Sequence, residues 1–151
     1  MRRLLYTMHF IGQASPAADR AAVLRTSGSA ASCVVSTIVL PSGVQTDVKA
    51  SEGDLAFLES ELRLTGPDEF QEIGQITFGG ESENLLNFST VGNGHMTAGL
   101  EPGTMAGTAS WKIEGGEGQF AAAQGFINST FTISGSGERS DFHCGLIFLP
   151  E

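Results

Sequence analysis

The sequence predicts an all-β protein, a closed antiparallel barrel of about eight short strands. Apolar and polar residues alternate with a period of two along many segments, which is the pattern of half-buried strands. Glycine is abundant, with 20 residues in a chain of 151, and stands at nearly every expected junction. A closed barrel is favoured over a sandwich because closure removes exposed sheet edges. The length fits a single domain over residues 1–151.

The N-terminal part predicts one strand and one short helix. Residues 4–11 alternate as a strand, with Tyr6 on the more apolar face. Ser15 and Pro16 then fit the N-cap and the first position of a helix over residues 16–25. The apolar residues near the end of that segment fit a strand equally well.

The middle of the chain continues the strand pattern. Residues 31–40 are rich in β-branched side chains, and a turn after them leads back through residues 44–49. Residues 55–65 alternate clearly between apolar and charged side chains. Residues 70–78 and 85–91 follow as further strands, each closed by glycine.

The C-terminal part contains the most regular alternation. Residues 108–114 form an expected strand with Trp111 directed inward. The glycine-rich residues 115–118 then break the pattern, because glycine accepts the positive φ angles of a tight reversal. The alternation returns at residues 126–133, and residues 141–149 are the last expected strand.

One stretch of the chain resembles a known family. The sequence GGEGQFAAAQG, Gly115 to Gly125, resembles the GGxGxFxxAxG signature of allene oxide cyclases and plant dirigent proteins, which related small bacterial barrel proteins also carry. The resemblance implies an eight-stranded antiparallel barrel that often forms dimers or trimers. It implies no particular catalytic residue, because the N-terminal half shows no corresponding match.

Charge and composition exclude several classes of function. The net charge of −9, with only eight lysines and arginines, disfavours nucleic acids and anionic membrane surfaces as partners. Residues 1–15 imitate a signal peptide, but they alternate like a strand and are expected to belong to the mature protein. Cys33 and Cys144 form no metal pattern and are expected to be buried free thiols, although a disulfide between them stays open. These features predict a cytoplasmic protein without a metal or cofactor.

Residues 70–78 give the sharpest indication of chemistry. Glu72 shares one face with Phe70, Ile76 and Phe78. If this face lines the barrel, Glu72 is a carboxylate in apolar surroundings that disfavour its charged form, which suits a general acid or base. The alternatives are that Glu72 reaches water at a rim or pairs with an arginine.

Three more residues complete the predicted site. The hydroxyl of Tyr6 can donate to a substrate oxygen, or Tyr6 can be a core residue with its tip in water. Trp111 and His143 fit a substrate-binding wall, and both also fit ordinary core positions. The prediction is therefore two catalytic residues, Glu72 and Tyr6, and five substrate-binding residues, Phe70, Ile76, Phe78, Trp111 and His143.

The site predicts a cofactor-independent cyclase or isomerase that acts on a small, mostly apolar substrate in the barrel lumen, which is also the chemistry that the resemblance implies. The alternatives are a non-catalytic barrel that binds a small molecule and a filled barrel that acts through its outer surface. Residues 4–11, 31–40 and 142–149 are apolar on both faces, which predicts self-association into a dimer or trimer.

Overall fold

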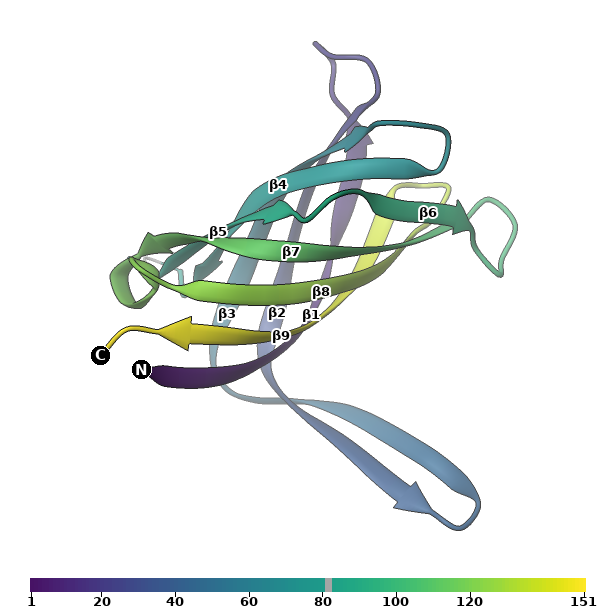
Figure 1. The fold of residues 1–151 in the computed structure, drawn as a ribbon. Coiled ribbons are helices and arrows are strands. Elements are labelled where there is room, and N and C mark those ends of the chain that lie inside the picture. Colours follow the sequence, from purple (N-terminus) through teal and green to yellow (C-terminus); the bar gives the residue numbers. More distant parts are fainter. Residues whose placement is uncertain (81–82) are drawn as a thin grey trace.

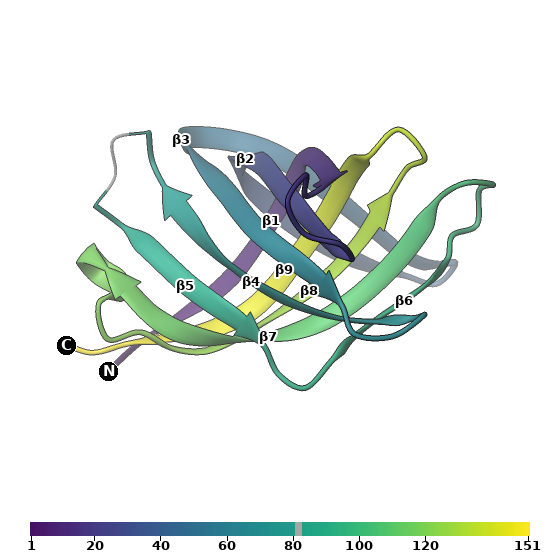
Figure 2. The ribbon, with the colours of Figure 1, turned by 90° about the horizontal axis from the view of Figure 1, so that it is seen from above.

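A computed structural model describes residues 1–80 and 83–151. These residues form one antiparallel sheet of nine strands in the order β3-β2-β1-β9-β8-β7-β5-β4-β6. Pairing of β3 with β4 brings the order back to its start, so the sheet closes in a barrel-like ring (Figures 1 and 2). The strands are β1 (Arg2–Pro16), β2 (Val23–Leu40), β3 (Gly43–Leu64), β4 (Glu69–Phe78), β5 (Leu85–Thr90), β6 (Gly94–Ala98), β7 (Met105–Glu117), β8 (Gln124–Ile133) and β9 (Glu138–Leu149).

The all-β prediction is confirmed, and two short strands share one place in the ring. Both β5 and β6 lie between β4 and β7. The β6 strand pairs with the start of β4 at Glu69 and Phe70, and β5 pairs with the remainder. The sequence analysis did not separate β6 as a strand of its own.

The predicted helix over residues 16–25 is wrong. Strand β1 continues to Pro16, which pairs with Leu24 of β2 across a short connection. Ala22 has a φ of 59°, outside the helical region, and its carbonyl accepts a hydrogen bond from the amide of Leu64 at 2.9 Å. In the described part of the chain the helical structure is the 3₁₀ turn η1 (Gly118–Phe120), and no described helix is long and apolar enough to cross a bilayer.

Strands β2 and β3 are longer than the ring requires. The β2 strand pairs with β1 only as far as residue 29, and β3 pairs with β4 only from residue 56 onward. Between these limits the two strands pair with each other and project from the ring as a hairpin (Figure 1). We call residues 33–50 the arm. A break in the register between Ala31 and Cys33 marks the place where it leaves the ring.

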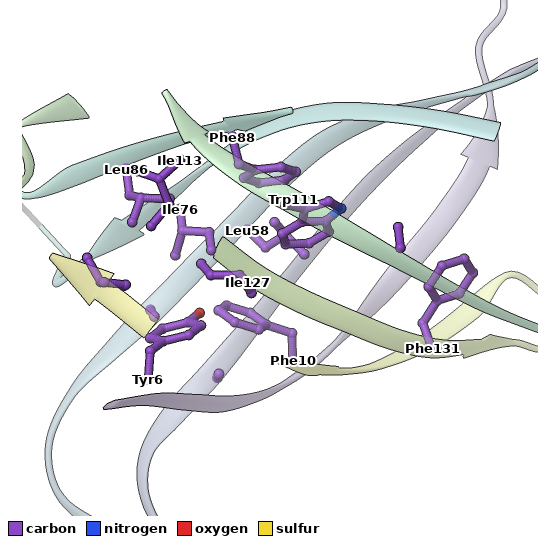
Figure 3. Close-up of a cluster of buried hydrophobic side chains, with 14 of the residues drawn as sticks. Tyr6, Phe10, Leu58, Ile76, Leu86, Phe88, Trp111, Ile113, Ile127 and Phe131 are labelled. Atoms are coloured by element: carbon purple, nitrogen blue, oxygen red, sulfur yellow. The ribbon is translucent and has the colours of Figure 1, made fainter. Parts of the chain in front are cut away.

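The ring interior holds one apolar cluster. Trp111 is fully buried, and its ring stacks on Phe88 with centroids 3.8 Å apart (Figure 3). The inward direction of Trp111 is therefore confirmed. Burial of each large apolar side chain contributes about 1.5–3 kcal/mol to folding. The largest apolar side chains buried to less than 2% exposure are Trp111, Phe10, Phe70, Phe131, Leu58, Leu62, Ile76, Leu86, Ile127 and Ile147.

The glycine-rich segment at the end of β7 and the turn η1 that follows it close one end of this cluster. Gly115 and Gly118 have φ angles of 76° and 61°, which favour glycine. The turn η1, which begins at Gly118, places Phe120 at 2% exposure against Phe78, with ring centroids 5.1 Å apart. The expected reversal at residues 115–118 is therefore wrong in its position, because Gly115 and Gly116 still belong to β7 and the chain turns only from Gly118 onward.

Candidate functional site

Strand β9 directs three ionisable side chains into the ring. Arg139, Asp141 and His143 alternate along the strand, so they share its inward face. They are 2%, 1% and 3% exposed. Ionisable residues of this kind are seldom buried unless they are paired, so their partners determine what the group can do.

His143 connects β9 to β1. Its Nδ1 lies 3.1 Å from the hydroxyl of Tyr6, and its Nε2 lies 3.0 Å from Oδ2 of Asp141. An ionised carboxylate only accepts hydrogen bonds, so Nε2 carries a hydrogen and donates it to Asp141. In the neutral ring Nδ1 is then the acceptor for the Tyr6 hydroxyl.

Arg139 joins two carboxylates. Its Nη1 and Nη2 donate to the two oxygens of Glu72 at 2.8 and 3.3 Å, and Nη2 also lies 3.0 Å from Oδ2 of Asp141. The guanidinium carbon lies 4.3 Å from the centroid of the Phe131 ring. The two-pronged contact with Glu72 fixes the plane of the guanidinium and therefore the position from which it holds Asp141.

Glu72 is fully buried, and it lies at the end of the contacts that begin with Tyr6. It accepts a hydrogen bond from the hydroxyl of Ser60 at 2.7 Å, besides the two from Arg139. Of the alternatives that the sequence leaves open for Glu72, the structure shows pairing with an arginine. Tyr6, His143, Asp141, Arg139 and Glu72 form one continuous series of hydrogen bonds and ion pairs, which we call the buried polar chain.

The surroundings shift the pKa values of several members. Burial raises the pKa of Tyr6 well above its ordinary value, and the negative charge of Asp141 adds to this effect. Burial alone would raise the pKa of Asp141, but its hydrogen bond with His143 and the charges of His143 and Arg139 hold it below its usual value. Burial opposes the charge of Arg139, but Glu72 and Asp141 raise its pKa overall. Tyr6 is thus kept as a phenol, beside an ionised aspartate and an ionised arginine.

Two buried donors have no acceptor among the described residues. They are Nε1 of Trp111 and Nε of Arg139. The Trp111 ring meets His143 edge to face, with centroids 4.7 Å apart, so both donors belong to groups in contact with the buried polar chain. An unpaired buried donor costs about 1–3 kcal/mol, and only an acceptor can satisfy it.

The structure also places the other predicted residues. Phe70 and Ile76 are fully buried, Phe78 is half-buried, and Tyr6 packs edge to face on Phe78 with centroids 6.1 Å apart. Glu72 and Tyr6 lie at opposite ends of the buried polar chain, separated by three side chains. They do not form a joint polar end of one pocket, as the sequence analysis expects.

The hollow beside Phe78 is small. It measures about 190 Å³ and lies where the arm leaves the ring, with Met8, Ala56 and Phe78 in its lining. Ligand pockets typically measure about 300–1,000 Å³. Two larger grooves lie elsewhere, one of about 560 Å³ across β2, β3 and β4 and one of about 540 Å³ beside residues 112–126.

The cysteines and acidic residues show no metal centre. In the part of the chain that the structure describes, no group of three His, Cys, Asp or Glu side chains could hold a metal ion. Cys33 and Cys144 are free, as expected. The prediction that both are buried is wrong, because Cys33 is partly exposed and Cys144 is exposed.

Sequence reasoning missed Arg139 and Asp141. Both lie at two-residue spacing from His143, so the series Arg-x-Asp-x-His on one strand was visible in the sequence. The expected strand began at Asp141, which left Arg139 outside it. The apolar residues on both sides of the C-terminal half also hid which face of the strand points inward.

No protein-family model, no curated protein and no solved structure matches this chain. Membership in the allene oxide cyclase-like family therefore stays a prediction that depends on residues 115–125.

Proposed function

We propose that this protein is a cofactor-independent cyclase or isomerase that acts on a small, mostly apolar substrate inside a closed barrel. The observation that carries the proposal is the buried polar chain, five ionisable side chains joined by hydrogen bonds and ion pairs within an apolar interior. Burying charged groups is costly, and clusters of perturbed ionisable groups are concentrated at functional sites. The resemblance at residues 115–125 favours the same chemistry.

In this proposal Tyr6 transfers the proton. When His143 is protonated, its Nε2–H donates to Asp141 and its Nδ1–H donates to the Tyr6 oxygen, so the Tyr6 hydroxyl hydrogen is free to bind a substrate oxygen. Tyr6 gives this proton to the substrate and regains one from Nδ1 of His143. The negative charge of Asp141 stabilises the protonated ring before the transfer. The same groups work in reverse when the substrate returns a proton.

Glu72 acts through Arg139 in this scheme. Its carboxylate orients the guanidinium, which in turn holds Asp141 against His143. We therefore assign Glu72 as a positioning residue rather than as the acid or base that its sequence context suggests.

The substrate carries an acceptor oxygen, such as an epoxide or a carbonyl compound. The unpaired N–H groups of Trp111 and Arg139 support this class, because an acceptor oxygen would satisfy either of them. Phe70, Ile76 and Phe78 supply apolar walls that fold the rest of the substrate, and such orientation provides much of the rate in a ring closure. The substrate enters where the Phe78 ring moves aside.

The decisive comparison is Tyr6→Phe against the wild-type protein on a panel of unsaturated fatty-acid epoxides and enones. Removing only the hydroxyl should lower turnover about 10²–10⁴-fold and leave binding largely intact. Glu72→Gln, which keeps the shape, should lower turnover less than Tyr6→Phe. Equal turnover by Tyr6→Phe and wild type would contradict the proposal.

The two grooves of about 560 and 540 Å³ have the size of ligand sites and favour a second candidate, a non-catalytic protein that binds a small apolar molecule. Its signature on the same panel is saturable binding, measured by tryptophan fluorescence of Trp111, without conversion of any compound. The two free cysteines fit a reducing compartment, and we propose a cytoplasmic location on that basis.

A further inference from the structure

The two faces of the arm differ in charge. Val35 pairs with Val48, and Val39 pairs with Val44, so these four valines lie on the same face. The opposite face carries Asp47 and Lys49. The uncharged arm face consists of Cys33, Val35, Thr37, Val39, Val44, Thr46, Val48 and Ala50.

This face lies open to solvent. Val39 and Val44 near the tip are 79% and 66% exposed, and Val35 and Val48 are 43% and 44% exposed. A two-stranded hairpin by itself is at best marginally stable in water. Contiguous exposed apolar surface of this kind marks an interaction site.

The uncharged arm face continues onto the outer wall of the ring. Val35 and Val48 line a hollow of about 190 Å³ together with wall residues of β1 and β9. Phe142 on this wall is 50% exposed and stacks on His9 with ring centroids 4.0 Å apart. Arm and wall therefore form one concave surface. We call its ring part, Thr7, His9, Phe142 and Cys144, the wall.

The charge of the protein favours a second copy as the occupant. The chain has a net charge of −9, yet the uncharged arm face has no acidic or basic residue and the wall has only His9. Burial lowers the pKa of His9, which favours its neutral form. Two copies can thus meet through these surfaces without bringing their negative charges together. A basic partner would find no opposite charge there.

The area of the arm favours a reciprocal contact. With a rise of about 3.3 Å per residue and strands about 4.8 Å apart, one arm face covers roughly 260 Å². One arm laid on one partner therefore buries about 500 Å² in total, well below the 1,200–2,000 Å² or so of stable interfaces. Two arms packed reciprocally double this total to about 1,000 Å², which is near the lower limit for a specific interface.

We propose that two copies of this chain form a dimer around a two-fold axis, in which each copy lays its uncharged arm face on the wall of the other. The contact is the same surface on both copies, as a two-fold axis requires. The proposal stands on the arm alone and is independent of the proposed activity.

The test is the oligomeric state of the full chain, measured by size-exclusion chromatography with light scattering. The wild-type protein should be a dimer at about 100 µM and dissociate on dilution. The double variant Val35→Asp with Val39→Asp places unpaired charges in the contact, so its dissociation constant should rise at least about 100-fold. The matched control, Val34→Asp with Ile38→Asp, alters the opposite face of the same strand and should change the constant less than about threefold.

A wall variant distinguishes the proposed contact from pairing between two arms. Phe142→Asp should also abolish the dimer, because the wall receives the partner's arm. The arm variants should keep the wild-type circular dichroism spectrum and thermal midpoint, since the arm lies outside the ring. A monomeric wild-type protein at about 100 µM, a trimer, a dimer unaffected by Phe142→Asp, or equal disruption by both arm variants would each overturn the proposal.

Discussion

The ring and the arm share strands β2 and β3, and the two regions differ in the burial of those strands. In β3, Leu58 and Leu62 are 2% and 0% exposed, while Val44 in the same strand is 66% exposed. Residue type and alternation are similar along the strand, but the ring part has β4 beside it and the arm part does not. Burial in a sheet is thus decided by the neighbouring strand rather than by the local sequence.

Charged residues show the same contrast. Arg139 and Glu72 form an ion pair at 2% and 0% exposure inside the ring, whereas Lys49 and Asp47 form one on the arm at 77% and 56%. The buried pair is coupled to further groups on several strands. The arm pair is surrounded by water, which screens its attraction.

The largest expected effect comes from breaking the buried pair. Arg139→Met leaves Glu72 and Asp141 as uncompensated buried carboxylates and should lower the free energy of unfolding by about 3–5 kcal/mol. Urea denaturation followed by circular dichroism measures this loss. Lys49→Met, which removes the arm pair, is the control and should leave the urea midpoint unchanged. Equal losses from the two variants would remove the distinction between the regions.

Two glycines with the same φ angle, one in the arm and one in the ring, test the difference between these regions further. Gly43 at the arm tip and Gly125 in β8 both have a φ of 134°, so alanine strains the backbone at either position. A Cβ at Gly43 meets nothing within 4 Å, whereas one at Gly125 would lie 2.1 Å from the carbonyl oxygen of Leu146. Gly125→Ala should therefore destabilise the protein by at least about 1 kcal/mol more than Gly43→Ala in thermal unfolding. Indistinguishable midpoints would show that the ring absorbs the clash.

The smallest expected effect is a pH dependence that arises in the ring. The folded pKa of Asp141 lies below its unfolded value, so its contribution to stability is fully present above the unfolded value of about 3.9. That contribution is lost as the pH falls through the lowered folded value. Urea midpoints measured from pH 6 downward should therefore fall less steeply for Asp141→Asn than for wild type below about pH 4. If the urea midpoints of the two proteins fell equally steeply, the protonation of Asp141 would make no contribution to the pH dependence of stability.

Local patterns were sufficient to predict much of the ring. The two-residue alternation placed Glu72 and Trp111 on inward faces, and the glycine run predicted a reversal that the chain makes from Gly118 onward, three residues later than expected. These features depend on residues that are near one another in the chain. The two-residue spacing from Arg139 to His143 is also a local feature, and it could have predicted that these side chains share one face of the strand.

Contacts between segments that are far apart in the sequence could not be predicted from the sequence. Glu72 and Arg139 are 67 positions apart, and no local feature of either strand identifies the other as its partner. The helix expected over residues 16–25 failed for a related reason, because the carbonyl of Ala22 is held by the amide of Leu64. Residues 31–40 have a good strand pattern both inside and outside a ring, so the arm could not be distinguished from a wall strand.

The pairing of β1 with β9 has a consequence for biosynthesis. Arg2 pairs with Leu149, so β1 obtains this neighbour only after all the residues between the two strands have been made. Until then one edge of β1 stays unpaired, which exposes its backbone to wrong pairing. Closure of the ring thus depends on contacts of very high sequence separation, which fold slowly.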